Sequence, residues 1–358
     1  MIPITREELG VWSKLVWELC GIVLDDSKGS LLETRLAALM SEQKAVSYSE
    51  LHRKVRDDPG PKLRQQVVDA IATNETSFFR DTSPFELLRH KLVPELVDRR
   101  RRLGLRPVPL RIWSAACSTG QEVYSTGIVL KELLGDLTGY DIRILGTDIS
   151  NRAMAAASYA YYSRAELERG MPAGHVARYF VPVGDQWKVR DEIRAMATFR
   201  TLNLLQPFSF PAPFDLIFCR NVALYFSEAD RSRLYRRLAE VLAPDGYLLI
   251  GATESIGALC PEARAPAPPA LGLLPAQEPA LGNASRRRRL RRAGRPSARF
   301  GALTARTPPS PRAHALAARF AQPRNRSPVN SVCLGGPLAI NNESDRRNDG
   351  ALRLQRVR

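Results

Sequence analysis

The stretch Arg111–Tyr124, RIWSAACSTGQEVY, decides the fold class of this chain. It opens with an apolar segment typical of a strand (Arg111–Ala115) and continues through a turn of small residues (Ala116–Gly120). It ends in the first turn of a helix, with an acid at Glu122. Many α/β proteins hold a nucleotide-like ligand at a helix N-terminus that follows a strand and a tight turn. The stretch therefore predicts an α/β domain with such a site.

A second strand narrows the ligand class. Ile142–Asp148, IRILGTD, ends in an acid 28 residues after Gly120. An acid at the end of the second strand of such a fold accepts hydrogen bonds from ribose hydroxyls. The turn after the first strand lacks the G-x-G-x-x-G pattern, which argues against a dinucleotide and against a dehydrogenase. We therefore expect an adenosine-bearing ligand of another kind.

Strand and helix patterns alternate from Leu110 onward, which predicts a parallel sheet. Helices are expected over Gln121–Leu134, after Asn151 and over Glu228–Leu242, and strands over Phe214–Cys219 and, after a Pro244-Asp245-Gly246 turn, over Tyr247–Gly251. Two further short segments, Tyr179–Val189 and Thr198–Leu202, predict a small antiparallel β insert at about residues 179–200. The ligand crevice should lie at the carboxyl edge of the sheet, where the strand order reverses.

Residues 1–73 are predicted to be all-helical. Apolar residues recur there at helical spacing, and three capping boxes mark helix starts: Thr5/Glu8, Ser30/Glu33 and Ser47/Glu50. This segment holds no catalytic constellation, so we expect a recognition role, with a purely structural cap as the alternative.

Residues 74–109 form a linker and a helix. The segment Asn74–Asp81, NETSFFRD, precedes a helix start at Ser83-Pro84, and that helix runs to four consecutive arginines, Arg99–Arg102. Cations favour a helix C-terminus, so the arginines predict a solvated helix end. A docking patch for an acidic partner is the alternative.

Charge is unevenly spread along the 358 residues. The net charge is +16, but residues 261–358 hold 19 Arg, no Lys, 5 acids and 13 of the 26 prolines, while residues 1–260 carry only +2. A net charge this close to zero gives residues 1–260 no evident nucleic-acid-binding character. The tail composition predicts disorder. Its lack of Lys suggests an out-of-frame segment, with a nucleic-acid-binding arm as the alternative.

The remaining composition excludes several classes. The five cysteines form no C-x-x-C pair, so neither a disulfide framework nor a zinc site is expected. The start, MIPITREELG, is unlike a signal peptide, and no apolar run approaches the ~18 residues of a membrane span. We expect a soluble, cytoplasmic protein without a metal.

Four segments together are more specific than the fold pattern. In chain order they are Asn74–Arg80, Trp113–Tyr124, Gly146–Ile149 and Phe214–Phe226. Their order and spacing resemble those of the bacterial chemotaxis-receptor methyltransferases, the CheR family, over roughly residues 5–257. The resemblance implies a small helical bundle joined to a Rossmann-like class I methyltransferase domain (residues 110–260) with a small antiparallel β insert. It also implies an S-adenosyl-L-methionine-dependent protein-glutamate O-methyltransferase that releases S-adenosyl-L-homocysteine.

The resemblance carries specific residues with it. Glu122 corresponds to the acid at the cofactor's amino-acid end, Asp148 to the ribose ligand, and Asn203-Leu204 to the pair beside the adenine. Arg220-Asn221 correspond to the pair that lines the cofactor and substrate cleft. Further cofactor contacts are implied for Asn74, Thr76 and Arg80, and Tyr225 is expected to face the methyl group.

A glutamate acceptor needs no general base, because its free pKa is about 4.3 and it is ionised at neutral pH. The four histidines (His52, His90, His175 and His314) lie outside the motifs. We expect Arg80 to orient the acceptor carboxylate through its guanidinium fork and Tyr225 to close the other side.

Each residue also has a simpler interpretation. Asp148 alone could be a helix cap, Glu122 a helix-dipole acid, and Arg80 a surface partner of Asp81 or Glu86. Phe78 and Phe79 are expected in the core. The joint pattern, rather than any one residue, favours the functional interpretation.

Two departures from the family pattern have consequences. The match fades after about Leu259, beyond Gly251–Ser255, so we expect the sheet to lack its last antiparallel strand. The loop between Phe180 and Trp187 is short, which favours tether-independent receptor recognition.

The expected partners are the cytoplasmic methylation helices of chemoreceptors, with no nucleic acid and no membrane insertion required, and a monomeric enzyme. Two alternatives stay open. One is a class I methyltransferase acting on another protein or a small molecule. The other is a non-catalytic binding module whose basic tail binds nucleic acid.

Overall fold

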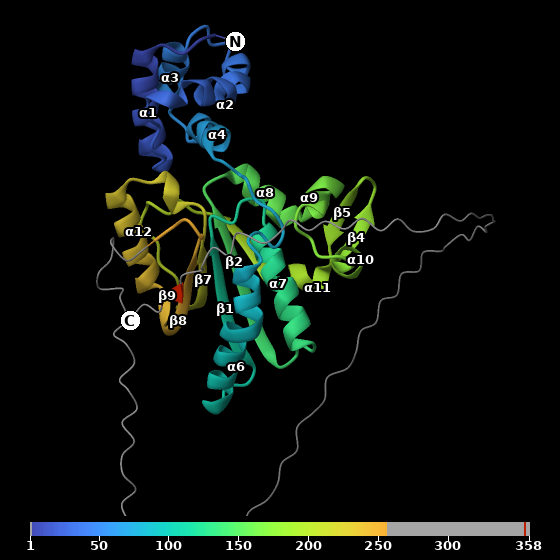
Figure 1. Cartoon of the computed structure of the whole chain (residues 1–358). Helices are drawn as coiled ribbons and strands as arrows, with labels where there is room; N and C mark the ends of the chain where they lie inside the picture. The colour runs from blue at the N-terminus through green and yellow to red at the C-terminus, as the bar shows by residue number, and fades with distance from the viewer. Residues whose placement is uncertain (1, 256–353, 356–358) are drawn as a thin grey trace, which may run out of the picture. The chain divides into compact units, whose positions relative to one another are not determined.

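The computed structural model describes residues 2–255 and 354–355, which form a helical domain followed by an α/β domain (Figure 1). The helical domain has its own core, in which Trp12, Leu36 and Tyr48 are buried. The indole Nε1 of Trp12 donates to the Tyr48 carbonyl at 3.0 Å and ties two helices together. The elements of this domain are α1 (Arg6–Cys20), η1 (Asp26–Lys28), α2 (Gly29–Glu42), α3 (Tyr48–Asp57) and α4 (Lys62–Ile71).

Of the three predicted capping boxes, one forms completely, one forms in part and one does not form. Thr5 and Glu8 form a complete capping box at the start of α1. Ser47 accepts from the amide of Glu50 as predicted, but Glu50 itself accepts from Val46, so only half of that box forms. The Ser30/Glu33 prediction is wrong, because α2 begins earlier, at Gly29, and the Glu33 carboxylate accepts instead from the amide of Ile4.

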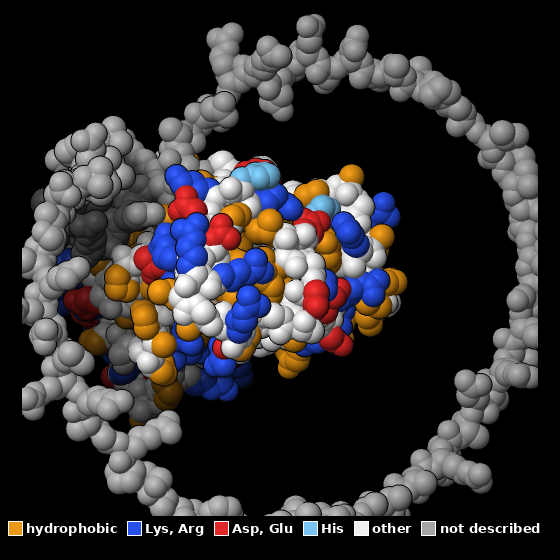
Figure 2. All heavy atoms as spheres, turned by 90° about the horizontal axis from the view of Figure 1, so that it is seen from below, with side chains coloured by type: hydrophobic (Ala, Val, Ile, Leu, Met, Phe, Trp, Pro, Cys, Tyr) orange, Lys and Arg blue, Asp and Glu red, His pale blue; other side chains and the backbone are white. Residues whose placement is uncertain are grey.

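The connecting helix runs through α5 (Ser83–Leu87), the π-helical turn η2 (Leu88–Leu92) and α6 (Val93–Arg102). The predicted solvated end is confirmed for Arg101 and Arg102, which are exposed, but not for the two arginines before them. Arg99 and Arg100 both pair with Asp245, and Arg100 also pairs with Asp215, so that the Arg100 side chain is only 11% exposed. Basic and acidic side chains are interspersed at this end of the molecule (Figure 2). The arginines anchor α6 to the sheet.

The central sheet has the strand order β6-β2-β1-β7-β8-β9. Every pair from β6 to β8 is parallel, and β9 pairs antiparallel with β8. Strands β2 and β6 lie on one side of β1, and β7 and β8 lie on the other. The strand order therefore reverses between β1 and β7, which opens a crevice at their carboxyl ends. The strands are β1 (Val108–Ala115), β2 (Tyr140–Asp148), β6 (Ala197–Thr201), β7 (Phe214–Cys219), β8 (Leu242–Ile250) and β9 (Leu354–Gln355).

Side-chain alternation along β1 builds a core on each face of the sheet. Leu110 and Ile112 belong to a cluster shared with α6 and with α7 (Gln121–Leu134). Trp113 belongs to the opposite cluster, which α12 (Glu228–Glu240) covers with Leu234 and Leu238. Helices on both faces leave the carboxyl edge of the strands as the place for a ligand, and the α/β class predicted from the sequence is confirmed.

The small antiparallel insert is a three-stranded sheet of order β3-β5-β4, with β3 (Tyr161–Ser163), β4 (Phe180–Val183) and β5 (Gln186–Val189). It carries α9 (Arg164–Glu168) and α10 (His175–Tyr179), while α8 (Asn151–Tyr159) precedes it and α11 (Asp191–Arg194) follows it. The assignment of Thr198–Leu202 to this insert was wrong. That segment is β6, which pairs parallel with β2 as an edge of the main sheet.

The structure differs from the sequence-based expectation at the predicted turn before the last parallel strand and at the edge of the sheet. The predicted turn at Pro244-Asp245-Gly246 lies inside β8, at a point where its register with β7 shifts between Phe214 and Leu216. The outer edge of β8 is not open there, because β9 pairs with Leu248 and Leu249. The predicted disorder of residues 261–358 otherwise falls outside the described residues. No helix in residues 2–255 is long and apolar enough to cross a membrane.

Candidate active site

A cleft of about 950 Å³, including its open mouth, lies at the carboxyl ends of β1, β2 and β7. Every site residue predicted from the sequence lines it, although the residues come from five separate segments of the chain. They are Asn74, Thr76, Arg80, Glu122, Asp148, Asn203, Leu204, Arg220, Asn221 and Tyr225. Their individual roles toward a ligand stay predictions.

The turn after β1 forms the floor of the cleft. Ala116 and Ser118 have left-handed backbone conformations, with φ of 64° and 51°, and Gly120 follows with φ of 95°. Such conformations are unfavourable for residues with a Cβ and cluster at ligand sites. Gly120 has a second constraint, because a Cβ there would lie 3.0 Å from that of Ala157. The sequence signal of small residues thus reflects a backbone that must bend sharply beneath the ligand.

Asp148 ties this turn to the end of β2. Its carboxylate accepts from the amide of Ser118 at 2.9 Å and from that of Ser150 at 3.0 Å. Burial raises the pKa of Asp148, and hydrogen bonds from these backbone amides oppose the rise. A carboxylate offers about four acceptor positions, so it can also accept from ribose hydroxyls. The helix-cap interpretation is wrong, because Ser150 caps α8 by accepting from the amide of Ala153, whereas Asp148 accepts from the amide of Ser150 itself, which precedes the helix.

Arg220, directly after β7, is the centre of a buried charge cluster. Its Nη1 donates to Glu122 Oε2 at 2.8 Å and its Nη2 to Asp81 Oδ2 at 2.7 Å. The same Nη2 donates to the Arg80 carbonyl at 3.0 Å, while Ser114 Oγ donates to the other oxygen of Glu122 at 2.7 Å. The Arg220 side chain is 3% exposed. One guanidinium therefore joins the Asn74–Asp81 segment to the acid of α7.

One donor of this cluster is unpaired. Within residues 2–255, the buried Nε of Arg220 has no hydrogen-bond partner, and neither do buried ring or guanidinium nitrogens of His52, Arg194 and Arg231, which do not line the cleft. The unpaired nitrogen by itself therefore does not mark a ligand site. The Glu122–Arg220 pair as a whole places a carboxylate beside a guanidinium at the cleft, and the carboxylate and ammonium of a zwitterionic group need one partner of each sign.

Arg80 and the two phenylalanines before it point in different directions. The Arg80 guanidinium donates to the Glu75 carbonyl at 2.9 Å, and not to Asp81 or Glu86 as in the surface-pair interpretation. Phe78 is fully buried and packs edge-on against Tyr162 and Phe180 of the insert. The phenylalanines are core residues, as predicted, and they anchor a loop that leaves Arg80 at the cleft.

The helical domain also contributes to the cleft, which the sequence analysis missed. Cys20 and Ile22, at the end of α1, line the cleft. The Nδ2 of Asn203 donates to the Leu19 carbonyl at 3.0 Å, and the amide of Val23 donates to the Tyr225 carbonyl at 3.0 Å. Nothing in the local pattern of residues 19–23 signals this, because the partners are about 180 and 200 residues away.

A second residue outside the predicted set is Glu254, in the segment after β8. From the sequence, Gly251–Ser255 is only a landmark of the family. Glu254 is 7% exposed, and its carboxylate accepts hydrogen bonds from backbone amides of the turn that follows Arg220. That turn leads into η3 (Ala223–Tyr225), which carries Tyr225 into the cleft.

The cleft residues fit S-adenosylmethionine. The ammonium and carboxylate of its amino-acid end match the opposite charges of the Glu122–Arg220 pair, and both residues line the cleft. Its ribose hydroxyls match Asp148. Its adenine matches the apolar and amide groups near Asn203 and Leu204, where Ile22 and Phe226 also line the cleft. Acids on the walls suit a cation, and no histidine in the described part of the chain lines the cleft.

Comparisons with known proteins agree with this geometry. Residues 7–72 match the family model described as "CheR methyltransferase, all-alpha domain", and residues 74–263 match "CheR methyltransferase, SAM binding domain". The boundary between the two matches falls between α4 and the Asn74–Asp81 segment.

Curated relatives cover the same part of the chain. Chemotaxis protein methyltransferase Cher2 of Pseudomonas putida is 40% identical over 245 residues, which is 67% of this chain and 87% of the relative. Chemotaxis protein methyltransferase 1 of Pseudomonas aeruginosa is 41% identical over the same shares. Chemotaxis protein methyltransferase of Vibrio parahaemolyticus is 38% identical over 72% of this chain and 92% of its own length. The chain therefore belongs to the CheR methyltransferase family of S-adenosylmethionine-dependent enzymes.

Proposed function

We propose that this enzyme transfers the methyl group of S-adenosylmethionine to glutamate side-chain carboxylates of chemoreceptors. The observation that carries the proposal is the meeting of Arg80, Tyr225 and the Glu122–Arg220 pair in one cleft. The relatives named chemotaxis protein methyltransferases support receptors as the acceptor class. We further propose that the enzyme is a cytoplasmic monomer and that its partners are the cytoplasmic methylation helices of receptors.

The residues of the cleft suggest how the acceptor is held. Arg80 lies at the cleft with one guanidinium N–H on the Glu75 carbonyl, and a guanidinium has five N–H donors. Its remaining donors can bind both oxygens of a carboxylate. Tyr225 enters the cleft from η3, and its backbone is held by Val23. These two side chains would hold an acceptor carboxylate between them.

The ionisation state of the acceptor explains why the reaction needs no general base. When bound, S-adenosylmethionine supplies an electrophilic methyl group on a sulfonium and takes the electron pair of the broken carbon–sulfur bond. A glutamate carboxylate is already ionised at neutral pH, so no proton has to be removed before attack. The task of Arg80 and Tyr225 is to align the carboxylate oxygen and to exclude water. Alignment of this kind can supply about 7–11 kcal/mol.

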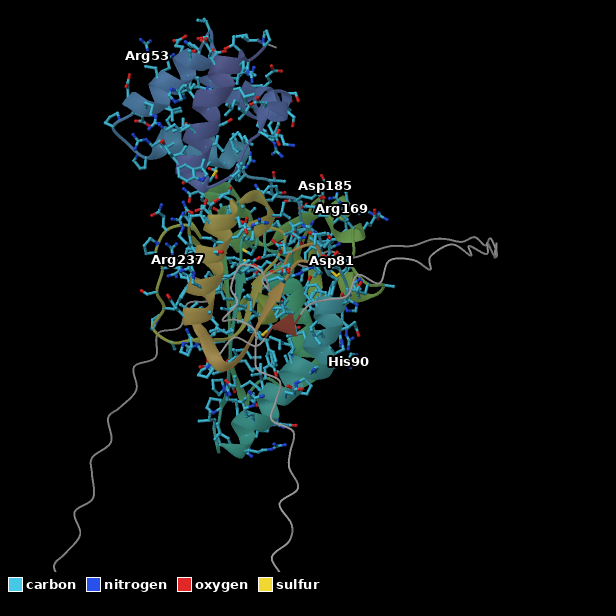
Figure 3. The ribbon with its side chains drawn as sticks, turned by 60° about the vertical axis from the view of Figure 1, so that its left-hand side comes forward. Arg53, Asp81, His90, Arg169, Asp185 and Arg237 are labelled. Atoms are coloured by element: carbon cyan, nitrogen blue, oxygen red, sulfur yellow. The ribbon has the colours of Figure 1, made fainter. Side chains whose placement is uncertain are left out.

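Domain roles follow from the same proposal. The helical domain, residues 1–73, would recognise the receptor, with the helix of residues 74–109 as a linker to the methyltransferase domain at residues 110–260. Arg53 lies on α3, in the part of the helical domain remote from Asp81 and the cleft (Figure 3). The β insert has only Gly184 and Asp185 between β4 and β5, which favours recognition without a receptor tether.

The proposal is tested by incubating the full chain with methyl-labelled S-adenosylmethionine and receptor-containing membranes. Label in the receptor band that alkali releases as volatile methanol identifies a carboxyl methyl ester. Label that resists alkali would indicate a methyltransferase with another type of acceptor. An Arg89→Ala variant, changed at a residue that pairs with Glu132 outside the cleft, is the matched active control. No receptor label from an enzyme that binds S-adenosylhomocysteine would overturn the proposal.

A further inference from the structure

Glu254 lies behind the turn that brings Arg220, Asn221 and Tyr225 to the cleft. Its two carboxylate oxygens accept four backbone amides. Oε2 accepts from Asn221 at 2.9 Å and from Gly251 at 2.7 Å, and Oε1 accepts from Val222 at 3.2 Å and from Ala223 at 2.9 Å. Three of these amides are consecutive in the turn after β7. A single side chain therefore fixes the path of the backbone between the cofactor residues and Tyr225.

The turn needs such a partner because its amides have none of their own. Amides at the start of a short helical turn such as η3 have no partner within the turn itself. Asn221 has φ of 57°, a left-handed conformation that Asn adopts more readily than most residues with a Cβ, and it turns the chain so that three successive amides face the same acceptor. The Glu254 carboxylate satisfies these amides and holds the turn in this conformation.

Gly251 shows how closely this contact is packed. A Cβ at Gly251 would lie 2.7 Å from Glu254 Oε2 and 3.0 Å from the amide nitrogen of Asn221. The Glu254 amide also donates to the Gly251 carbonyl at 3.0 Å, which closes the loop after β8. Gly251 and Glu254 together hold the loop after β8 against the turn after β7.

From this geometry we infer that Glu254 is a positioning residue for the cofactor and acceptor site, acting through the Asn221–Ala223 backbone without touching the cofactor. Glu254 lies behind the turn while Arg220, Asn221 and Tyr225 line the cleft. The inference rests on the proposed function for its choice of ligand. It assigns an active-site role to the loop after β8, which lies near the end of the region that matches the family.

Glu254→Gln tests this with the shape of the side chain kept. One oxygen becomes an NH₂ group, which would face backbone amides that are themselves donors. We expect the dissociation constant of S-adenosylhomocysteine to rise at least tenfold, measured by calorimetry on the full chain with the binding stoichiometry fitted. Gly251→Ala displaces the same contact from the other side and should weaken binding in the same direction.

Asp215→Asn is the matched control. Asp215 is a buried carboxylate at the other end of β7, where it pairs with Arg100 and accepts from the amide of Arg111 at 2.8 Å. Its loss should lower the melting temperature and leave the dissociation constant unchanged. If Glu254→Gln instead lowers only the melting temperature or the stoichiometry, at an unchanged dissociation constant, its role is merely structural and the inference is overturned.

The binding assay separates this inference from the proposed function, because it needs no acceptor. A wild-type chain that binds S-adenosylhomocysteine but methylates no receptor would refute the proposed function alone. An unchanged dissociation constant in both Glu254→Gln and Gly251→Ala would refute the inference alone, whatever the acceptor proves to be.

Discussion

At each end of strand β7 an arginine lies between two carboxylates, and the two clusters differ in how completely their polar atoms are paired. At its start, Arg100 pairs with Asp215 and Asp245. At its end, Arg220 pairs with Asp81 and Glu122. Both arginine side chains are largely buried, at 11% and 3% exposed.

The two clusters differ in what is left unsatisfied. In the Arg100 cluster, no buried side-chain nitrogen or oxygen of the described residues lacks a partner. In the Arg220 cluster, Nε has none, and the neighbouring Asp81 and Asn221 have left-handed φ of 53° and 57°. Only the Arg220 cluster also lines the cleft. We therefore expect the Arg100 cluster to stabilise the fold alone and the Arg220 cluster to contribute to ligand binding as well.

The largest expected effect comes from Arg220→Ala. The change leaves Glu122, whose side chain is 14% exposed, without its cation at the cleft, and breaking a buried pair costs about 3–5 kcal/mol. We expect the affinity for S-adenosylhomocysteine to fall at least about a hundredfold by calorimetry. Arg100→Ala is the comparison, and it should lower stability only. Equal losses of affinity in the two variants would remove the distinction between the clusters.

Arg80→Ala separates catalysis from binding. Loss of the guanidinium should lower kcat for receptor methylation at least tenfold, because the acceptor carboxylate loses its orienting partner. The affinity for S-adenosylhomocysteine should fall by less than kcat. Steady-state kinetics with receptor membranes measure this, with Arg89→Ala as the control. Unchanged turnover in Arg80→Ala would refute the orienting role.

Asp148→Ala tests the ribose assignment. We expect S-adenosylhomocysteine to bind about tenfold more weakly, with a smaller change in kcat at saturating cofactor. An analogue without ribose hydroxyls should show little difference between wild type and variant, because the lost interaction is absent from both complexes. If the analogue loses as much affinity as S-adenosylhomocysteine, Asp148 acts by holding the amides of Ser118 and Ser150 in place and not as a ribose ligand.

The smallest effect is expected at Asp245, in the saturated cluster. Hydrogen bonds from Arg100 and then Arg99 lower the pKa of Asp245 to about 2. A lowered carboxyl pKa stabilises the fold above pH 4 and loses that contribution as the pH falls toward 2. Asp245→Asn should therefore cost about 1 kcal/mol in the free energy of unfolding at pH 7 and progressively less below pH 4.

Urea unfolding of wild type and Asp245→Asn at several pH values measures this difference. Binding of S-adenosylhomocysteine at pH 7 should be the same in both proteins. A pH-independent difference in stability would show that the Arg100 cluster contributes through packing and not through charge.

Much of the fold follows from local sequence. The predicted bounds of α7 and β7 coincide with those observed, Gln121–Leu134 and Phe214–Cys219. Two of the site residues, Glu122 and Asp148, could be predicted from the fold pattern, because the carboxyl ends of parallel strands meet at one edge. The others were implied by the resemblance to the CheR family. The small residues at Ala116–Gly120 signalled the bent backbone of the floor for the same local reason.

Other features depended on which segments meet. Thr198–Leu202 has a strand pattern, but only pairing with β2 shows that it belongs to the main sheet. Four consecutive arginines are typical of a solvated helix end, yet Asp215 and Asp245, which lie more than 100 residues later, bury Arg100. Composition carries no information on such distant partners.

The sequence by itself determined the α/β class, much of the order of its elements and ten of the residues at the cleft, because these depend on periodicity, turn chemistry and family motifs. Only the tertiary structure showed that the end of α1 lines the cleft, that Arg220 has an unpaired Nε, and that Glu254 holds the turn that follows Arg220. The physical reason is that hydrogen-bond saturation and burial are properties of groups brought together in space, and a side chain's own neighbours in sequence do not specify them.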